Sequence, residues 1–331
     1  MVTVGPHLLA ADIGGTNARF ALCSVREDRG SLREPGSAGR LELLEQVILP
    51  TTDFASFAAL LAGLPAGFAA SAQAAVLAIA GPVERGRFCR PPNIPYTFDL
   101  DALPPGALPA TSLFINDFTA QAHGCRMLGP DKALQVLPGV MDPERTQAVI
   151  GAGTGLGKAA LIPDGRGGYL VGASEGGHAA FPFVGPEEFA FQRFAMEATG
   201  EPYPRWETVV SGLGLSLLHA FHAGARVSPA EAAAALTPQS PVATWFSRFY
   251  GRACRDFALE VLALGGVYVS GGVAARNPQL LTHPAFGEEF RRSATHGALL
   301  AAIGVRAVRH ESAGLWGAAA AAWQAASVGE T

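Results

Sequence analysis

Two short segments of the chain carry glycine, threonine and a cationic side chain in the same order. The first is Asp12-Ile13-Gly14-Gly15-Thr16-Asn17-Ala18-Arg19, and the second is Gly151-Ala152-Gly153-Thr154-Gly155-Leu156-Gly157-Lys158. Apolar residues flank both, so each is predicted to form a strand, a glycine turn and a second strand. Glycines at such a bend allow backbone N–H groups and a threonine hydroxyl to point at one anion. Two of these hairpins facing each other would hold a polyphosphate, which indicates a phosphotransferase or an ATPase.

Other glycine-rich phosphate patterns do not fit these residues. A Walker A loop would need Gly at Ala152 and Ser or Thr at Ala159. The dinucleotide fingerprint G-x-G-x-x-G fails because Lys158 stands at its third glycine. No H-R-D motif precedes Asp12-Ile13-Gly14, which excludes a protein-kinase D-F-G. A purely structural hairpin stays open for either segment taken alone.

Asp12 follows an apolar run and comes directly before the first glycine turn. A carboxylate in this place could hold a hydrated Mg²⁺, which prefers few protein ligands together with phosphate oxygens. The alternative is an aspartate that caps the turn. The neighbouring Gly14-Gly15-Thr16 favours the metal role.

Asn116 and Asp117 come directly after the apolar stretch Ser112–Ile115 and open a helical pattern. Ligands of open α/β sheets bind at the carboxyl ends of the strands. Asp117 could accept the proton of a substrate hydroxyl as that hydroxyl attacks phosphorus, and Asn116 offers both a donor and an acceptor to a sugar hydroxyl. The alternative is an ordinary Asx helix cap.

Ser174-Glu175-Gly176-Gly177-His178 is a dense polar cluster after another apolar run. Glu175 and His178 can both bind pairs of hydroxyl groups. Gly172-Ala173-Ser174-Glu175-Gly176 also matches the G-x-S-x-G nucleophile elbow of serine hydrolases. That elbow needs a helix directly after it, and the glycines and prolines that follow disfavour one.

Two further features have structural alternatives. Gly271-Gly272 follows the strand pattern Val267–Ser270 and could lie against a flat adenine, or could be a tight strand-to-helix turn. His219 and His222 stand three residues apart on a predicted helix with no carboxylate in a metal pattern, so they are interpreted as a helix edge.

Buried apolar runs that alternate with helical patterns indicate an α/β fold. Asp53 is predicted to cap a helix that ends at Ala62, and alanine-rich residues 313–326 to form a helix packed tightly against a neighbour. The two Gly-Thr pairs suggest a weak internal repeat. The predicted strands are residues 8–13, 20–25, 43–49, 74–80, 112–115, 147–150, 158–162, 169–171, 267–270 and 305–309.

The composition fits a globular protein with a large core. Of the 331 residues, 49% are hydrophobic and 16% charged, and the net charge of −4 disfavours a general nucleic-acid binder. The four cysteines form no C-x-x-C pair, so neither a zinc knuckle nor a redox motif is expected. No signal peptide or membrane-spanning run is visible, and we expect reduced thiols and a cytoplasmic location.

In their order along the chain, the motifs resemble those of bacterial glucokinases in the hexokinase–Hsp70–actin ATPase superfamily. Residues 12–19 and 151–157 resemble the two phosphate motifs, and Ile115–Ala120 the first connecting motif with its catalytic aspartate. Glu175-Gly176-Gly177-His178 resembles the sugar-binding E-G-G-H stretch. Residues 269–273 resemble the adenosine motif, and residues 314–318 the second connecting motif.

The resemblance implies a two-domain actin-like ATPase (ribonuclease H-like) fold with the active site in the cleft. Residues 1–126 plus 310–331 would form a small α/β domain, and residues 127–309 a larger α+β domain. It implies a homodimer that phosphorylates the C6 hydroxyl of D-glucose with ATP and Mg²⁺, the first step of glycolysis.

The resemblance also assigns roles to individual residues. Asp117 would be catalytic, and Asp12 would hold Mg²⁺ through water. The implied sugar ligands are Asn116, Asp117, Gly155, Glu175, His178 and Glu207, and the implied nucleotide ligands are Asp12, Gly14, Gly15, Thr16, Asn17, Gly153, Thr154, Gly271 and Gly272.

The match is weakest around Glu207, because Thr208 stands where the family's E-R-V-L-S-G has arginine. Kinases of the related ROK group add a C-x-C-G-x-x-G-C zinc motif that the cysteines of this chain cannot supply, which favours the non-zinc branch. An actin- or Hsp70-like ATPase that acts on a protein partner is the second hypothesis. It would not need Asn116-Asp117 together with Glu175 and His178. The choice among hexoses and between ATP and polyphosphate stays open.

Overall fold

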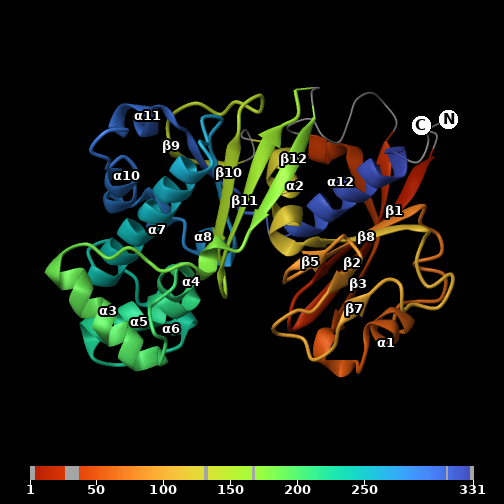
Figure 1. The fold of residues 1–331 in the computed structure, drawn as a ribbon, viewed down its shortest axis with the longest axis horizontal. Helices are drawn as coiled ribbons and strands as arrows, with labels where there is room; N and C mark the ends of the chain where they lie inside the picture. Colours follow the sequence, from red (N-terminus) through yellow and green to blue (C-terminus); the bar gives the residue numbers. More distant parts are fainter. Residues whose placement is uncertain (1–3, 27–36, 130–132, 166–167, 311, 329–331) are drawn as a thin grey trace. The chain divides into compact units, whose positions relative to one another are not determined.

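The computed structural model describes residues 4–26, 37–129, 133–165, 168–310 and 312–328 (Figure 1). The chain divides into two compact units. The first comprises Met1–Lys132 and Ser312–Thr331, and the second comprises Ala133–Glu311. The predicted boundary between residues 126 and 127 falls inside the continuous helix α2 (Asp117–Leu128), and the first unit keeps this helix whole.

The first unit is built on a five-stranded sheet in the order β3-β2-β1-β4-β8. Strand β1 pairs antiparallel with β2 and parallel with β4, and β4 pairs parallel with β8. The strands are β1 (Val4–Ile13), β2 (Asn17–Arg26), β3 (Leu41–Pro50), β4 (Ala74–Ile79) and β8 (Thr111–Asn116).

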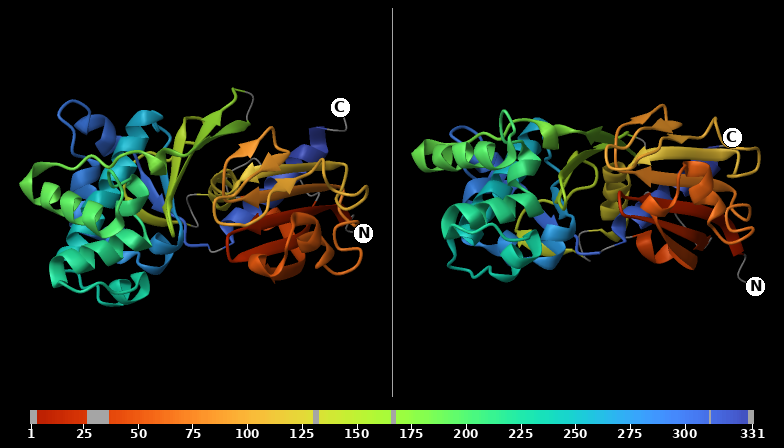
Figure 2. Two further views of the ribbon diagram at one scale, coloured as in Figure 1. Left: turned by 60° about the horizontal axis from the view of Figure 1, so that its bottom comes forward. Right: turned by 90° about the horizontal axis from the view of Figure 1, so that it is seen from below.

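Helices cover both faces of this sheet. Side chains alternate along a strand, so Leu9, Ala11 and Ile13 of β1 point to one face, where they share a core cluster with α1 (Phe57–Ala62). The other face of β1 is covered by α12 (Ala313–Val328), which also contacts β4 and α2. Helix α12 lies beside β1 in every view (Figure 1, Figure 2).

Glycine allows α2 and α12 to touch through their backbones. A Cβ added to Gly317 would lie 1.7 Å from the carbonyl oxygen of Ala120, and one added to Gly124 would lie 1.9 Å from that of Ala313. Any larger residue would push the helices apart. The predicted tight packing of the alanine-rich helix is therefore confirmed.

The second unit has a six-stranded sheet in the order β12-β11-β10-β13-β14-β9. In sheet order, the five strands from β12 to β14 repeat the pattern of the first unit, since β10 pairs antiparallel with β11 and parallel with β13. The predicted internal repeat is thus seen in the topology. The strands are β9 (Leu134–Leu137), β10 (Gln147–Ala152), β11 (Leu156–Pro163), β12 (Tyr169–Ser174), β13 (Val267–Ser270) and β14 (Val305–Ala307).

Helices make up most of the rest of this unit, as the sequence predicts for residues 186–264. Phe191, Trp206, Phe246, Phe249 and Phe257 belong to its largest apolar cluster. The helices are α3 (Gly185–Thr199), α4 (Trp206–Val209), α5 (Gly212–Ala223), α6 (Pro229–Ala234), α7 (Pro241–Glu260), α8 (Gly272–Arg276), α9 (Gln279–Thr282), α10 (Pro284–Phe290) and α11 (Gly297–Ala302).

Several predicted elements differ from the structure. The predicted cap Asp53 is wrong: it lies in the 3₁₀ turn η2 (Thr51–Asp53), and α1 begins after Ser56, whose hydroxyl accepts a hydrogen bond from the Ala59 N–H at 3.1 Å. A small sheet of β5 (Val83–Glu84), β6 (Phe88–Cys89) and β7 (Phe98–Asp99) was not predicted, because two-residue strands show no periodicity. No helix among the described ranges has the length and apolar character to cross a membrane.

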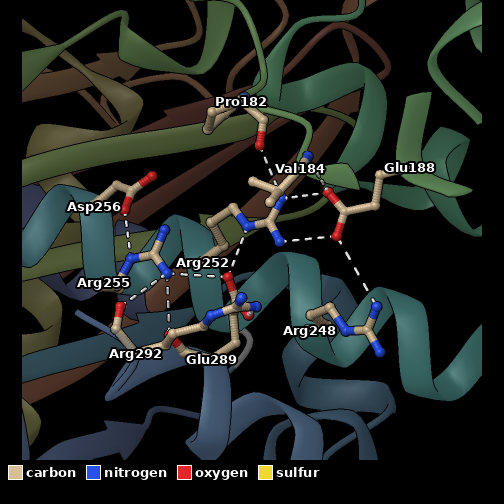
Figure 3. Close-up of polar contacts among 9 residues, drawn as sticks. All are labelled: Pro182, Val184, Glu188, Arg248, Arg252, Arg255, Asp256, Glu289 and Arg292. Carbon is tan, nitrogen blue, oxygen red and sulfur yellow. Dashed lines mark hydrogen bonds and ion pairs between the residues drawn. The ribbon is translucent and has the colours of Figure 1, made fainter. Parts of the chain in front are cut away.

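A buried arginine connects three helices of the second unit (Figure 3). Arg252 of α7 donates from Nη1 and Nη2 to the carboxylate of Glu188 on α3, at 2.6 and 2.9 Å. Its Nε donates to Glu289 of α10 at 2.8 Å. All three side chains are at most 6% exposed, so the ions depend on one another for the interactions that water would otherwise supply.

Replacing Arg252 by methionine should strongly destabilise this unit. The substitution leaves Glu188 and Glu289 buried without their main cation, a defect that lowers the free energy of unfolding by ~3–5 kcal/mol. Urea unfolding followed by circular dichroism measures the loss. Arg248→Met is the matched control, because the Arg248 side chain is 33% exposed and lies 4.0 Å from Glu188. It should lose less than ~1 kcal/mol.

The same variant has a pH signature. Burial raises the pKa of Glu289, but the hydrogen bond from Arg252 and the neighbouring arginine charges outweigh this and lower it from its ordinary value of 4.5. A lowered pKa makes the carboxylate stabilising above pH 4.5, and the contribution is lost as the pH falls through the folded-state value. Arg252→Met should weaken this acid dependence. Equal losses in the two variants, or an unchanged acid limb, would contradict the assignment.

Candidate active site

The first set of predicted site residues lies at one edge of the sheet in the first unit. Ile13, Ile79 and Asn116 are register partners across β1, β4 and β8, so the carboxyl ends of these parallel strands coincide. Asp12 lies one residue before that edge, and Asp117 is the first residue of the helix that follows it. The edge therefore carries carboxylates about two strand spacings apart, ~10 Å.

The first glycine turn is held by its own backbone and by η2, which directly follows β3. The Gly14 N–H donates to the Asn17 carbonyl at 3.0 Å, and the Thr51 hydroxyl donates to the Gly14 carbonyl at 2.9 Å. A Cβ on Gly15 would lie 3.2 Å from Cβ of Asn93, so the loop that carries Asn93 packs against this turn. Thr16 and Asn17 are exposed at its tip, where their polar groups can meet a ligand.

Asp12 is a largely buried carboxylate with one cationic neighbour. Burial raises the pKa of its carboxyl, and the charge of Arg19, whose Nη1 is 4.0 Å away, acts in the opposite direction. Within the described ranges, no three His, Cys, Asp or Glu side chains gather closely enough to hold a metal by themselves. A single carboxylate fits Mg²⁺, whose remaining ligands are usually water and phosphate oxygens. A Cβ on Gly314 would lie 3.5 Å from Asp12 Oδ2, so α12 closes one side of this position.

Asn116 caps the helix that Asp117 begins. Its Oδ1 accepts from the N–H groups of Phe118 at 2.8 Å and Thr119 at 3.3 Å, and its Nδ2 donates to the Gly81 carbonyl at 3.1 Å. The Asx-cap interpretation is therefore confirmed for the side-chain oxygen. An amide nitrogen carries two N–H groups, so the second can still donate to a sugar hydroxyl.

Asp117 occupies the first turn of α2, where the helix N-terminus favours a negative charge. Its Oδ1 accepts from the Phe118 N–H at 2.9 Å. Cap and helix together fix the backbone that carries the carboxylate. The geometry is suitable for a base that must keep its orientation at the sheet edge.

In the second unit the structure brings Gly155, Glu175, His178 and Glu207 together. Glu175 Oε2 is 3.5 Å from His178 Nε2, and His178 Nδ1 is 3.3 Å from Glu207 Oε1. A Cβ on Gly155 would lie only 2.6 Å from Glu207 Oε2. Glu207, the weakest of the sequence assignments, is thus in contact with the predicted sugar cluster. Two carboxylates and an imidazole supply the donors and acceptors that bind neighbouring hydroxyls.

Two local contacts hold this cluster in place. The Trp206 N–H donates to the Ala179 carbonyl and the Phe181 N–H to the Pro204 carbonyl, each at 2.9 Å. They join the segment after His178 to the segment before Glu207. Gly177 allows the turn to pass close to β11, because a Cβ there would lie 2.0 Å from the Leu156 carbonyl oxygen.

Arg205, which was not predicted from the sequence, contacts both His178 and Glu207. Its Nη1 lies 2.9 Å from His178 Nδ1 and 2.5 Å from Glu207 Oε1. Nothing in the local sequence marks this arginine, since it precedes Glu207 by two residues in a proline-containing connection. Only the fold brings it beside His178.

The second glycine turn lies close to Glu207 on one side and to the β13–α8 turn on the other. The Gly153 N–H donates to the Gly155 carbonyl at 2.8 Å, and the Gly153 carbonyl accepts from the Gly212 N–H at 3.0 Å. Gly271 has a φ of +89° and lies so close to β10 that a Cβ would be 2.5 Å from the Ala152 carbonyl oxygen. The tight strand-to-helix turn is therefore confirmed for Gly271-Gly272, and adenine contact stays a prediction.

The cationic residues of the two hairpins differ. Arg19 is partly exposed beside Asp12. Lys158 is only 1% exposed, with its Nζ over the rings of Trp206 and Phe257 at 5.1 and 5.3 Å. Burial lowers the pKa of Lys158, and Glu260 opposes this shift. Lys158 therefore packs against Trp206, the residue before Glu207, instead of extending from the glycine turn.

The serine-hydrolase interpretation fails on the structure. Residues 176–178 form a single 3₁₀ turn after Glu175, and the next α-helix begins only at Gly185. The nucleophile elbow requires a helix at that point.

His219 and His222 lie on α5, as the sequence predicted. His219 Nδ1 is 2.9 Å from the Ala225 carbonyl oxygen, and burial lowers the pKa of His222.

Known proteins resemble this chain along nearly its whole length. A family model described as Glucokinase matches residues 9–325. A glucokinase from a Synechocystis species is 30% identical over 364 aligned residues, which cover 98% of this chain and 100% of the relative.

Two solved structures support the predicted two-domain actin-like ATPase fold. The glucokinase from an Antarctic psychrotroph has a TM-score of 0.78 and 28% identity and covers 96% of this chain and 99% of its own. The Balamuthia mandrillaris glucokinase, solved in complex with glucose, has a TM-score of 0.77 at 22% identity, covering 96% and 94%. With a family match across nearly its whole length and the motifs in the expected order, the chain belongs to the glucokinase family.

Proposed function

We propose that this ATP-dependent sugar kinase transfers the γ-phosphoryl group of ATP to the C6 hydroxyl of D-glucose, giving ADP and glucose 6-phosphate as the first step of glycolysis in the cytoplasm. The observation that carries the proposal is the contact among Glu175, His178, Glu207 and Gly155 beside the second glycine turn. The glucose found in the Balamuthia structure supports the choice of sugar.

Sugar recognition rests on hydrogen bonds from adjacent hydroxyls. Glu175 and Glu207 would accept from these hydroxyls, and His178 would donate to one of them. Asn116 of the first unit would add a further N–H. Groups of this kind discriminate strongly between sugars, because a missing hydroxyl leaves a partly buried carboxylate or amide without its partner.

Asp117 would act as the base. As O6 of glucose attacks the γ-phosphorus, its proton passes to the Asp117 carboxylate and the bond from phosphorus to the β–γ bridging oxygen breaks, releasing ADP. Phosphoryl transfer depends mainly on positioning and charge stabilisation. The cap of α2 at Asn116 supplies the positioning of this carboxylate.

The two glycine turns would bind the phosphates through their N–H groups and through Thr16, Asn17 and Thr154. Gly271 and Gly272 would lie against the adenosine. Asp12 would hold Mg²⁺ through water, and the ion, when bound, neutralises charge on the phosphates. We also propose that the two compact units are the domains of the enzyme and that it works as a homodimer.

The first test of this function is turnover with and without glucose. A sugar kinase should produce ADP rapidly only when glucose is present, whereas an ATPase of the actin or Hsp70 type hydrolyses ATP without sugar. Coupled assays of ADP and of glucose 6-phosphate measure hydrolysis and transfer separately. Mannose, fructose and glucosamine serve as competing sugars, and formation of glucose 6-phosphate without ADP reports polyphosphate as the donor. Brisk glucose-independent hydrolysis with no glucose 6-phosphate would reject the proposal.

Asp117→Asn should lower kcat by ~10²–10⁴, the usual contribution of a general base. The amide keeps the shape of the side chain but accepts no proton, so the Kd for glucose should change much less. Stopped-time assays of glucose 6-phosphate and calorimetric titration separate the two effects. Asp53→Asn, the same change at an exposed position of the same unit, is the control. Near-normal turnover of Asp117→Asn would remove this residue from the base role.

Removal of divalent cations should abolish turnover, and Mg²⁺ should restore it without zinc. Because Asp12 would hold the ion through water, Asp12→Asn should raise the Mg²⁺ concentration for half-maximal rate by ~10–100-fold. Titration of Mg²⁺ into EDTA-treated enzyme measures this, again with Asp53→Asn for comparison. Stoichiometric zinc in the purified protein, or an unchanged requirement in Asp12→Asn, would speak against the assignment.

A further inference from the structure

We propose that Arg205 is a positioning residue of the sugar site, which fixes the tautomer of His178 and the orientation of Glu207. The inference rests on the proposed function, because it concerns how the same side chains receive the sugar. Arg205 is only partly exposed, at 32%, and lies between the imidazole and the carboxylate. Its guanidinium contacts both through one nitrogen, Nη1.

The contact with His178 determines where the imidazole proton lies. A guanidinium only donates hydrogen bonds, and Arg205 Nη1 at 2.9 Å is nearer to His178 Nδ1 than Glu207 Oε1 is at 3.3 Å, so Nδ1 is the acceptor of a guanidinium hydrogen. The proton of the neutral ring is then on Nε2, the nitrogen that faces Glu175 at 3.5 Å. Arg205 thereby makes His178 a donor on the side of Glu175.

The contact with Glu207 engages one carboxylate oxygen and leaves the other on the opposite side. Oε1 receives the second Nη1 hydrogen of Arg205 at 2.5 Å, while Oε2 lies on the side of Gly155, 2.6 Å from where a Cβ of that residue would be. The absence of a side chain at Gly155 allows Oε2 to lie this close to the glycine turn. One N–H donor and one oriented acceptor are thus presented by His178 and Glu207, a pattern suited to two adjacent hydroxyls.

Further contacts hold Arg205 itself in place. Its Nη2 donates to Glu201 Oε1 at 2.5 Å, and the hydroxyl of Thr208 donates to Glu201 Oε2 at 2.7 Å. The Thr208 hydroxyl also accepts from the Arg205 N–H at 3.2 Å. Arginine is an uncommon residue at a helix N-cap, where a short side-chain oxygen is preferred. Since no side-chain oxygen of residue 205 caps α4, the cationic side chain and not the cap explains the choice of residue.

The test compares Arg205→Ala and Arg205→Lys with the unchanged enzyme. Loss of charge-assisted hydrogen bonds to His178 and Glu207 in Arg205→Ala should raise the Kd and KM for glucose by ~10–100-fold. The KM for ATP should stay within ~2-fold, below the effect of one such bond. Lysine is shorter and lacks the planar fork by which Arg205 also binds Glu201 through Nη2, so Arg205→Lys should recover part of the affinity only. Arg145→Ala, an exposed arginine paired with Asp142 at 3.4 Å in the same unit, is the control.

The tautomer is read directly by nitrogen-15 NMR of the histidine rings at mildly alkaline pH, with His178→Gln to assign the signal. The unchanged enzyme should show a proton on Nε2 of His178, and Arg205→Ala should lose this fixed tautomer. A proton on Nδ1 in the unchanged enzyme overturns the proposal even where Arg205→Ala does not fold. Unchanged glucose affinity in a folded Arg205→Ala overturns it as well. If the unchanged enzyme neither binds nor phosphorylates glucose, it is the proposed function that fails.

Discussion

In each unit one central strand pairs antiparallel with the strand after it and parallel with a strand far along the chain. The antiparallel partner must be reached by a tight turn, and the parallel partner brings its own carboxyl end to the same edge. Strands β1 and β10 both have this arrangement. As a result, strand pairing places the two glycine turns, Asp117 after β8 and Gly271-Gly272 after β13.

Hydrogen bonds within the protein fix the orientation of several candidate site residues. Asn116 caps α2, Thr51 binds the Gly14 carbonyl, and Arg205 joins His178 to Glu207. Each contact removes a rotamer or backbone freedom that binding would otherwise have to restrict. The long-range contact from Arg252 to the carbonyl of Pro182, at 2.8 Å, supports the same segment that leads away from His178.

The features that the sequence predicted well are local ones. Glycine turns, the Asn116-Asp117 pair and the buried strand from Ala74 are encoded within a few neighbouring residues, and the structure agrees with each. Features that require distant partners could not be seen. Arg205 meets His178 across 27 positions, and Arg252 meets Glu188 across 64, so no spacing rule joins them. Helix α1 is capped by Ser56 and not by the predicted Asp53, because both residue types are good caps and only packing decides between them.

The backbone contact between α2 and α12 joins an early segment of the chain to the last helix, which has a consequence for folding during synthesis. Helix α12 follows the whole of the second unit, yet it covers β1 and β4 of the first. During synthesis one apolar face of β1 and β4 therefore stays uncovered until residues 313–328 have left the ribosome. The second unit holds its own strands and helices in one continuous stretch and can fold in that interval. The first unit, although it begins the chain, can therefore complete its fold only after the second unit has been synthesised.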